Sequence, residues 1–292
     1  MTPKVGAVAI TGSSGYLGGI IREQMRQRGV ATIELVRTPK TDAARPFQLD
    51  RDPDPGLLEG VDVLIHCAYD MTVRSSSEIR RVNIEGTARL LALAEDSGVR
   101  RSIVLSSMSA WTGTEQLYGR AKLEIEELSL AHGAVPIRPG LVYGPEPGGM
   151  MGTLRRLARL PIIPLVGGNS IQFTVHQDDF VAAVWALVSA PDLPSLPIGV
   201  ANPVPVPFRH VLERLVWDQD RNPRFLPVSW RLLKGLLDLA ERCKLPLPVR
   251  SDSLLGLVKP ASCVPNLEVL DGLGIQLRRY GQPVPSAELD ES

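Results

Sequence analysis

The sequence contains little cysteine. Its 292 residues include three, Cys67, Cys243 and Cys263, an odd number without the spacing of a metal site, and each stands among apolar neighbours. This pattern offers no cysteine-ligated metal centre, so we expect no metal. We interpret the three side chains as buried thiols of a protein that stays in a reducing cytoplasm.

An excess of charge is also absent. Lys and Arg together number 32, as do Asp and Glu, so the chain lacks the basic surplus that usually accompanies binding to nucleic acids or anionic membranes. No apolar run approaches the roughly 20 residues of a membrane-spanning helix, and the start, MTPKVGAVAITG, has no secretion signal. We therefore expect a cytoplasmic protein with a small-molecule substrate, no nucleic acid partner, no membrane span, and a homodimer as one option.

The first half of the chain alternates between strand-like and helical patterns. Apolar strand-like runs lie at 5–10, 31–36, 45–50, 61–68, 101–107 and 134–144, and amphipathic helical patterns at 16–29, 78–98 and 118–133. Because the strands are apolar on both faces, they predict a parallel sheet that is covered on both sides. The expected fold class is α/β, a Rossmann-type doubly wound parallel sheet with right-handed crossovers.

The second half has a different composition. Prolines become dense after about residue 145, and the strict alternation stops, although a strand at 171–177 and a helix at 178–190 predict a return to the sheet. We expect a dinucleotide-binding Rossmann domain at 1–147, rejoined by 171–200. The segments 148–170 and 201–292 are then expected to form a smaller, helix-rich C-terminal substrate lobe.

One helix of this lobe has two interpretations. WRLLKGLLDLAERC, residues 230–243, carries an apolar stripe at Trp230, Leu233, Leu237 and Ala240. Such a stripe suits either a core or a membrane surface. We favour the core, because the polar positions mix both charge signs, whereas an interfacial helix is usually rich in Lys and Arg.

A glycine-rich loop follows the first predicted strand. In TGSSGYLG, the spacing of Gly12, Gly15 and Gly18 allows a sharp turn off the strand, close approach of a pyrophosphate to the backbone, and tight packing of helix on strand. The following helix would direct its N-terminal N–H groups at the phosphates. A simple strand-to-helix turn is the alternative, but the place of the loop in the alternating pattern favours a phosphate site.

Several motifs in order resemble the extended short-chain dehydrogenase/reductase superfamily, the NAD-dependent epimerase/dehydratase-like branch. They are TGSSGYLG, VDVLIHCAY, VNIEGT, YGRAK, IRPGLVYGP and HQDDFVAA, which span residues 5 to about 190. The resemblance implies a hydride-transferring enzyme. It also implies a cofactor site formed by Gly12, Ser13, Ser14, Gly15, Tyr16, Leu17, Gly18, Arg37, Asp50, Ala68, Asn83, Lys122 and Pro139.

Tyr118 and Lys122 are the expected catalytic pair. Four residues apart on a helix, they share one face, so we expect the ammonium to lower the pKa of the phenol toward the operating pH. The tyrosine could then exchange a proton with a substrate oxygen while nicotinamide carries a hydride.

The third catalytic group is expected to be a serine hydroxyl at the end of the fifth strand. LSSMSAW offers Ser106, Ser107 and Ser109, and alignment with the family's serine pair favours Ser107, although an ungapped match would place Met108 there.

The end of the second strand predicts the cofactor. An acidic residue at this place binds the ribose 2′-hydroxyl of NAD, whereas an arginine accommodates the 2′-phosphate of NADP. Val36 and Arg37 stand there, and Glu34 is two residues too early, so NADP(H) is favoured, with NAD(H) as the alternative. Asp50 resembles the family's adenine-contacting acid, and His66 is expected to pack or hydrogen-bond rather than to catalyse.

The substrate is less defined. Extended-branch enzymes that act on sugar nucleotides commonly carry an arginine for the diphosphate before the late strand, where this chain has Gln172; Arg155, Arg156 and Arg209 are conceivable substitutes. The function expected is an NADP(H)-dependent oxidoreductase or epimerase/dehydratase acting on a nucleotide sugar or a hydrophobic ketone. The alternative is a non-catalytic dinucleotide-binding regulator or assembly protein, which would have no need of Tyr118 and Lys122.

Overall fold

A seven-stranded parallel sheet forms the centre of the molecule. The computed structural model describes residues 5–243 and 250–282. The strand order is β11-β6-β5-β4-β1-β2-β3, and every neighbouring pair is parallel. The strands are β1 (Ala7–Thr11), β2 (Thr32–Val36), β3 (Ala44–Pro46), β4 (Val61–His66), β5 (Arg101–Leu105), β6 (Val135–Pro139) and β11 (Ile198–Val200). The predicted doubly wound Rossmann-type sheet is confirmed.

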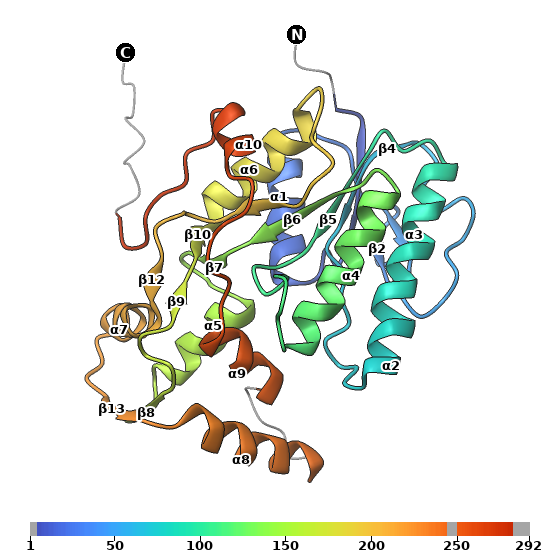
Figure 1. Ribbon diagram of the computed structural model, residues 1–292. Coiled ribbons are helices and arrows are strands. Elements are labelled where there is room, and N and C mark those ends of the chain that lie inside the picture. Colours follow the sequence, from blue (N-terminus) through green and yellow to red (C-terminus); the bar gives the residue numbers. More distant parts are fainter. Residues whose placement is uncertain (1–4, 244–249, 283–292) are drawn as a thin grey trace, which may run out of the picture.

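Helices cover both faces of this sheet (Figure 1). On one face lie α1 (Tyr16–Gln27), α6 (Gln177–Ser189) and α10 (Glu268–Gly272). On the other lie α2 (Ser76–Ile79), the π-helical turn η1 (Arg80–Ile84), α3 (Glu85–Asp96) and α4 (Leu117–Ala131). Since both faces are covered, most positions of the central strands are buried and apolar, as expected of a parallel sheet.

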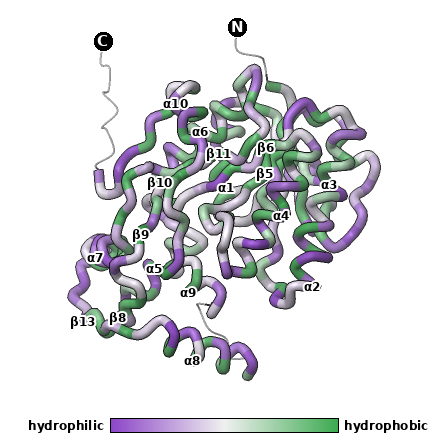
Figure 2. The backbone as a smooth tube through the Cα atoms, viewed as in Figure 1, coloured by the Kyte–Doolittle hydropathy of each residue, from purple (hydrophilic) through white to green (hydrophobic). Residues whose placement is uncertain are grey.

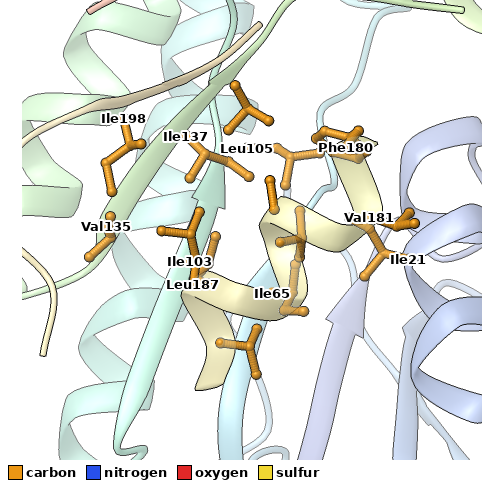
Figure 3. Close-up of a cluster of buried hydrophobic side chains, with 14 of the residues drawn as sticks. Ile21, Ile65, Ile103, Leu105, Val135, Ile137, Phe180, Val181, Leu187 and Ile198 are labelled. Carbon is orange, nitrogen blue, oxygen red and sulfur yellow. The ribbon is translucent and has the colours of Figure 1, made fainter. Parts of the chain in front are cut away.

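The core beneath α1 and α6 is dry and closely packed. Figure 3 shows Phe180 and Leu187 of α6 against Ile65, Ile103 and Ile137 of the central strands, and all five side chains are fully buried. This packing holds α1, which follows the glycine-rich loop, at a fixed place on the sheet.

Two predicted strands differ from the structure in their bounds. The strand expected at 134–144 breaks at Gly140 into β6 and β7 (Leu141–Tyr143), and β7 pairs with β10 (Thr174–His176) instead of continuing in the large sheet. A Cβ at Gly140 would lie 2.6 Å from the carbonyl oxygen of Phe173, so only glycine allows the chains to meet there. The strand expected at 45–50 was also too long, because β3 ends at Pro46.

The remaining elements pack mainly on two smaller apolar clusters, and we call this part the C-terminal lobe. It contains α5 (Gly149–Leu157), β8 (Ile162–Leu165), α7 (Phe208–Trp217), β13 (Arg224–Pro227), α8 (Trp230–Arg242) and α9 (Ser251–Val258). The short strands β9 (Ile171–Gln172) and β12 (Val206–Pro207) pair beside it. After α9 the chain returns to the sheet, where Leu270 is fully buried in the core under α6.

Within residues 5–243 and 250–282, no helix has the length and apolar character needed to cross a bilayer. In the same part of the chain, no group of three His, Cys, Asp or Glu side chains is arranged to hold a metal ion.

Candidate active site

The glycine-rich loop has the geometry of a phosphate cradle. Gly12 has a positive φ of 64°, and a Cβ at Gly18 would lie 2.3 Å from the carbonyl oxygen of Gly12. Gly18 is therefore required for the close approach of helix and strand, whereas Gly15 is exposed and a Cβ there would come no nearer than 3.2 Å to Gly12. Gly15 is the position that leaves room for a ligand.

The N-terminus of α1 is open to an anion. The helix begins at Tyr16 after Gly15, with no side-chain cap and no acidic residue in its first turn. Unpaired N–H groups at such an end bind phosphate oxygens. The loop and helix thus fit the pyrophosphate of a dinucleotide.

The two serines of the loop have different environments. Ser13 is buried, and its hydroxyl donates to Glu34 Oε2 at 2.9 Å, while Ser14 is exposed. Arg22 Nη1 also donates to Glu34 Oε2 at 2.9 Å. The Glu34 carboxylate is therefore already occupied, and these bonds hold its pKa below the ordinary value although burial acts in the opposite direction.

Arg37 extends from the sheet edge just beyond β2. Its side chain is exposed, and its charge helps to lower the pKa of the Asp70 carboxyl beyond β4, after the larger effect of the hydrogen bonds from Thr72. Arg37 and the glycine-rich loop thus stand at the carboxyl ends of neighbouring strands, where ligands bind in sheets of this type. Asp50, in the turn after β3, is exposed.

Ala68 and Asn83 hold the backbone segments that border the site. Ala68 N donates to Thr11 Oγ1 at 3.0 Å, and its backbone lies directly against Gly12. Asn83, buried in η1, holds the chain after β4 through Asp70: its Oδ1 accepts from Asp70 N at 2.6 Å, and its Nδ2 donates to Asp70 O at 3.1 Å. Asn83 therefore fixes the loop that borders the site.

His66 forms part of the same support. Its Nδ1 is 2.8 Å from Thr11 Oγ1 and its Nε2 is 2.9 Å from Thr87 Oγ1. Because the Thr87 hydroxyl donates to Asn83 O, Nε2 must be the donor to Thr87, which leaves Nδ1 as an acceptor. Burial, with a smaller contribution from the charge of Lys122, lowers the pKa of His66 to about 3, so the ring is neutral and structural, as expected.

A cavity of about 580 Å³ joins the glycine-rich loop to the C-terminal lobe. The expected site residues that line it are Gly12, Gly15, Tyr16, Leu17, Gly18, Ser107, Tyr118, Lys122 and Pro139. Ser13, Ser14, Arg37, Asp50, Ala68 and Asn83 lie outside its wall. The structure thus brings the loop and the expected catalytic residues to one cavity.

Tyr118 and Lys122 lie side by side on α4, with Lys122 Nζ 5.8 Å from the centre of the Tyr118 ring and 4.7 Å from that of Tyr69. Lys122 Nζ donates to Leu105 O at 2.6 Å. Burial lowers the pKa of Lys122 to about 8.

The expected direction of the phenol pKa shift was wrong. Burial raises the pKa of Tyr118 to about 12, and a hydrogen bond with Ser107 offsets part of this rise. The reason is that desolvation of the phenolate outweighs the distant ammonium, which is directed at a carbonyl oxygen. Tyr118 is therefore protonated at neutral pH.

The structure distinguishes the three serines after β5. The Ser106 hydroxyl is buried and donates to Glu126, which also forms a two-pronged ion pair with Arg138. Ser107 faces Tyr118, and its Oγ accepts from Ser109 N at 3.1 Å, which leaves the Ser107 proton free to be donated. Ser107 has the best geometry of the three.

The C-terminal lobe contributes wall residues that sequence reasoning missed. Asp252 of α9 accepts from Leu117 N at 2.7 Å and from Tyr118 N at 3.2 Å. Gln116, the residue just before α4, also lines the cavity and is 6% exposed. Its side chain does not cap the helix, and its Oε1 has no hydrogen-bond partner. Arg250, another wall residue, donates to Met71 O at 3.1 Å. No local pattern could have shown these contacts, because α9 lies 134 positions beyond Tyr118.

The expected diphosphate ligands are not gathered at the cavity. Gln172 lines it, but its Nε2 donates to Leu257 O at 3.0 Å. Arg155 donates to Pro145 O, and Arg156 donates to Thr153 Oγ1. Arg209 pairs with Glu213. In the described chain, the arginine in the cavity wall is Arg250, and much of the remaining surface is apolar, including Met71, Met108, Met150, Met151, Leu141, Phe173 and Leu257.

The expectation for the cysteines was wrong at two of three positions. Cys67 is half-buried at the cavity wall, and burial raises the pKa of its thiol to about 12. Cys243 and Cys263 are exposed.

Comparison with known proteins agrees with this geometry. Ceramide reductase from Caulobacter vibrioides (strain NA1000 / CB15N) is 30% identical over 202 residues, 64% of this chain and 62% of that protein. A 4-hydroxy-2-methyl-3-oxo-4-farnesyl-3,4-dihydroquinoline-1-oxide ketoreductase from Stigmatella aurantiaca is 32% identical over 130 residues, 40% of this chain and 37% of that protein. The matched parts thus span less than two thirds of either relative.

The fold is also similar to that of MoeE5, solved in complex with UDP-glucose and NAD, with a TM-score of 0.72 at 21% identity over 94% of both chains. The sequence model of the NAD dependent epimerase/dehydratase family matches residues 8–198. On this match, with the phosphate cradle and the Tyr118 and Lys122 pair in place, the chain belongs to the NAD dependent epimerase/dehydratase family.

Proposed function

We propose that this protein is an NADP(H)-dependent reductase of a hydrophobic, lipid-like ketone. The observation that carries the proposal is the protonated Tyr118 hydroxyl, paired with Ser107, in a cavity whose wall toward the C-terminal lobe is largely apolar. A cavity of this kind suits an apolar substrate held by a few polar groups. The printed names of the ceramide reductase and the farnesyl quinoline ketoreductase support the same substrate class.

The residues take the following roles in reduction. Ser107 donates a hydrogen bond to the ketone oxygen, and Tyr118 transfers its proton to that oxygen as negative charge develops. Lys122 keeps its charge close to the phenol and offers its remaining N–H groups to the ribose hydroxyls of the cofactor. When bound, the nicotinamide supplies the hydride, so one hydride and one proton convert the ketone to the alcohol.

The protonated phenol is in the state that reduction requires. A general acid must carry its proton at the operating pH, and a phenol with a pKa of about 12 does so at pH 7. The same apolar wall is unfavourable for a sugar diphosphate, which calls for a fork of cationic donors.

NADP(H) is proposed from the charges at the end of β2. The Glu34 carboxylate is neutralised by Arg22 and bonded by Ser13, so it is not free for a ribose 2′-hydroxyl. Arg37 is exposed beside this place and suits a 2′-phosphate.

The experiment measures reduction of a long-chain ketone by the full-length protein with NADPH and with NADH. Tyr118→Phe should lower kcat by about 10²-fold or more while NADPH binding, followed by fluorescence, stays within about twofold. A fully active variant would remove Tyr118 from its role. Binding of NADPH without turnover of any ketone or alcohol would instead favour a non-catalytic dinucleotide-binding protein.

Arg37→Ala is tested in the same assay. It should raise the KM for NADPH by about tenfold and leave that for NADH nearly unchanged, because only NADPH carries the 2′-phosphate. The matched control is Arg28→Ala, which removes an exposed arginine just after the C-terminal end of α1. Equal use of NADH and NADPH by the unmodified protein would contradict the NADP(H) proposal.

A further inference from the structure

Helix α8 presents a second apolar stripe that the protein leaves uncovered. Leu232, Leu236 and Leu239 are 62%, 56% and 58% exposed. At about 100° per residue, these leucines and the exposed Cys243 fall within an arc of roughly 60°. In Figure 1, α8 lies at the edge of the molecule farthest from the large sheet.

The opposite side of α8 is the one that packs. Leu237 is buried, and Trp230 and Leu233 are partly buried with it in one small cluster. The prediction of a core stripe is therefore confirmed for these three residues, but it does not account for the outward leucines. Figure 2 shows hydrophilic and hydrophobic residues alternating along the helix.

The charged side chains of α8 differ in whether they are engaged by other residues. Both of its acids are engaged near the start of α9: Glu241 Oε1 accepts from Ser251 N at 2.7 Å, and Asp238 pairs with Lys234 at 2.7 Å and also hydrogen-bonds Ser251. The exposed charged residues of α8 are Arg231 and Arg242. On the same helical projection, both arginines lie roughly 60–80° from Leu239, on one flank of the leucine stripe.

We propose that the exposed face of α8, formed by Leu232, Leu236, Leu239, Arg231 and Arg242, docks on an anionic lipid surface. Leucines that enter the acyl boundary beside cations that reach the headgroups are the composition of an interfacial helix. The balanced charge of the whole sequence does not oppose this, because Asp238 is paired with Lys234 and Glu241 is engaged by Ser251, which leaves Arg231 and Arg242 as the exposed charged residues of α8.

The size of the face favours a membrane over a second copy of the chain. A helix of 13 residues is about 20 Å long, and its exposed face is roughly 10 Å wide. A stable protein interface needs about 800 Å² from each partner. A bilayer sets no such threshold, because it accepts a single amphipathic helix.

The docked helix would lie next to the substrate cavity. Glu241 joins α8 to the first residue of α9, and Asp252, Ser253, Gly256 and Leu257 of α9 line the cavity. The delivery of a lipid ketone from the membrane to Tyr118 by this route rests on the proposed function. The docking itself is independent of that function.

The experiment is sedimentation of the full-length protein with vesicles, either pure phosphatidylcholine or a mixture with phosphatidylglycerol. We expect binding to the anionic vesicles that weakens with salt. Changing Leu232, Leu236 and Leu239 together to Gln should reduce it at least about tenfold. The matched triple change to Met keeps the apolar surface and should bind within about twofold of the unmodified protein.

The charges are tested separately. Arg231→Gln with Arg242→Gln should reduce anionic-vesicle binding roughly tenfold. Because these side chains are exposed, the variants should melt like the unmodified protein and reduce a water-soluble short-chain ketone normally. This readout separates a failure of docking from a failure of the proposed reductase activity.

Three results would overturn the docking proposal. The first is that the unmodified protein does not bind anionic vesicles, and the second is that the Gln triple variant binds them equally well. The third is that the unmodified protein forms a dimer that the Gln changes dissociate, while neither protein binds vesicles. Equal affinity for neutral and anionic vesicles would overturn the role of the two arginines.

Discussion

The large sheet and the C-terminal lobe differ in how completely they bury their apolar side chains. Around the sheet, the large apolar side chains of the core, such as Phe180 and Leu187, are fully buried. The lobe leaves Trp217, Leu226 and the outward leucines of α8 more than half exposed.

This difference corresponds to two tasks. A dinucleotide is a constant ligand, and a rigid, closely packed site holds it without rearrangement. The lobe forms the other end of the cavity and carries apolar side chains that solvent reaches. The following predictions test whether the sheet half is as rigid, and the lobe as adaptable, as this comparison implies.

The largest effect is expected at the glycine-rich loop. Gly18→Leu places a Cβ 2.3 Å from Gly12 O, so the loop must move and we expect loss of the folded protein. Gly15→Leu is less crowded at its Cβ, and it should leave the fold intact while NADPH binding is lost. Both are followed by circular dichroism and NADPH fluorescence.

The matched control lies in the lobe. A Cβ at Gly235 of α8 would have no atom within 4 Å, so Gly235→Ala should be neutral or stabilise the protein by up to about 1 kcal/mol. Undiminished NADPH binding by Gly15→Leu would mean that the loop is a structural turn.

A second effect is expected from acid, through His66. Its pKa is about 3 in the folded protein and 6.5 without the fold, so between these values the unfolded chain binds the proton that the folded one rejects. The contribution is complete above pH 6.5 and is lost as pH falls, by about 1.4 kcal/mol per pH unit. Urea unfolding at pH 7, 6 and 5 measures it.

His66→Gln is the comparison for the pH series. The variant should be less stable at pH 7, because two buried hydrogen bonds are changed, but its stability should fall less steeply between pH 6.5 and 5. An equally steep fall would assign the acid sensitivity to other groups.

The smallest effect is expected at Asp252, where the two halves meet. Its carboxylate is the acceptor for the first N–H groups of α4, so Asp252→Ala should lower the unfolding free energy by about 1–2 kcal/mol. Displacement of Tyr118 should lower kcat severalfold with little change in NADPH affinity. Asp252→Asn keeps one acceptor oxygen and should recover part of kcat, whereas unchanged kinetics in Asp252→Ala would show that α4 needs no support from the lobe.

Much of the sheet half could be predicted because its signals are local. The loop before α1 and the pair Tyr118 and Lys122 are patterns of a few residues, and strand and helix periodicity placed them at one edge of the sheet. The boundaries were less accurate at Gly140, which divides a predicted strand, and at Pro46, where β3 ends earlier than expected. The roles of the site residues themselves stay predictions.

The sequence by itself determined the parallel sheet, the glycine cradle and the position of Tyr118, since each depends on neighbours in the chain. Only the tertiary structure decided the upward shift of the Tyr118 pKa, the choice of Ser107 over Ser106, the contact of Asp252 with α4, and which side of α8 is exposed. The physical reason is that desolvation, pairing of charges and burial depend on residues that are distant in sequence and meet only after folding.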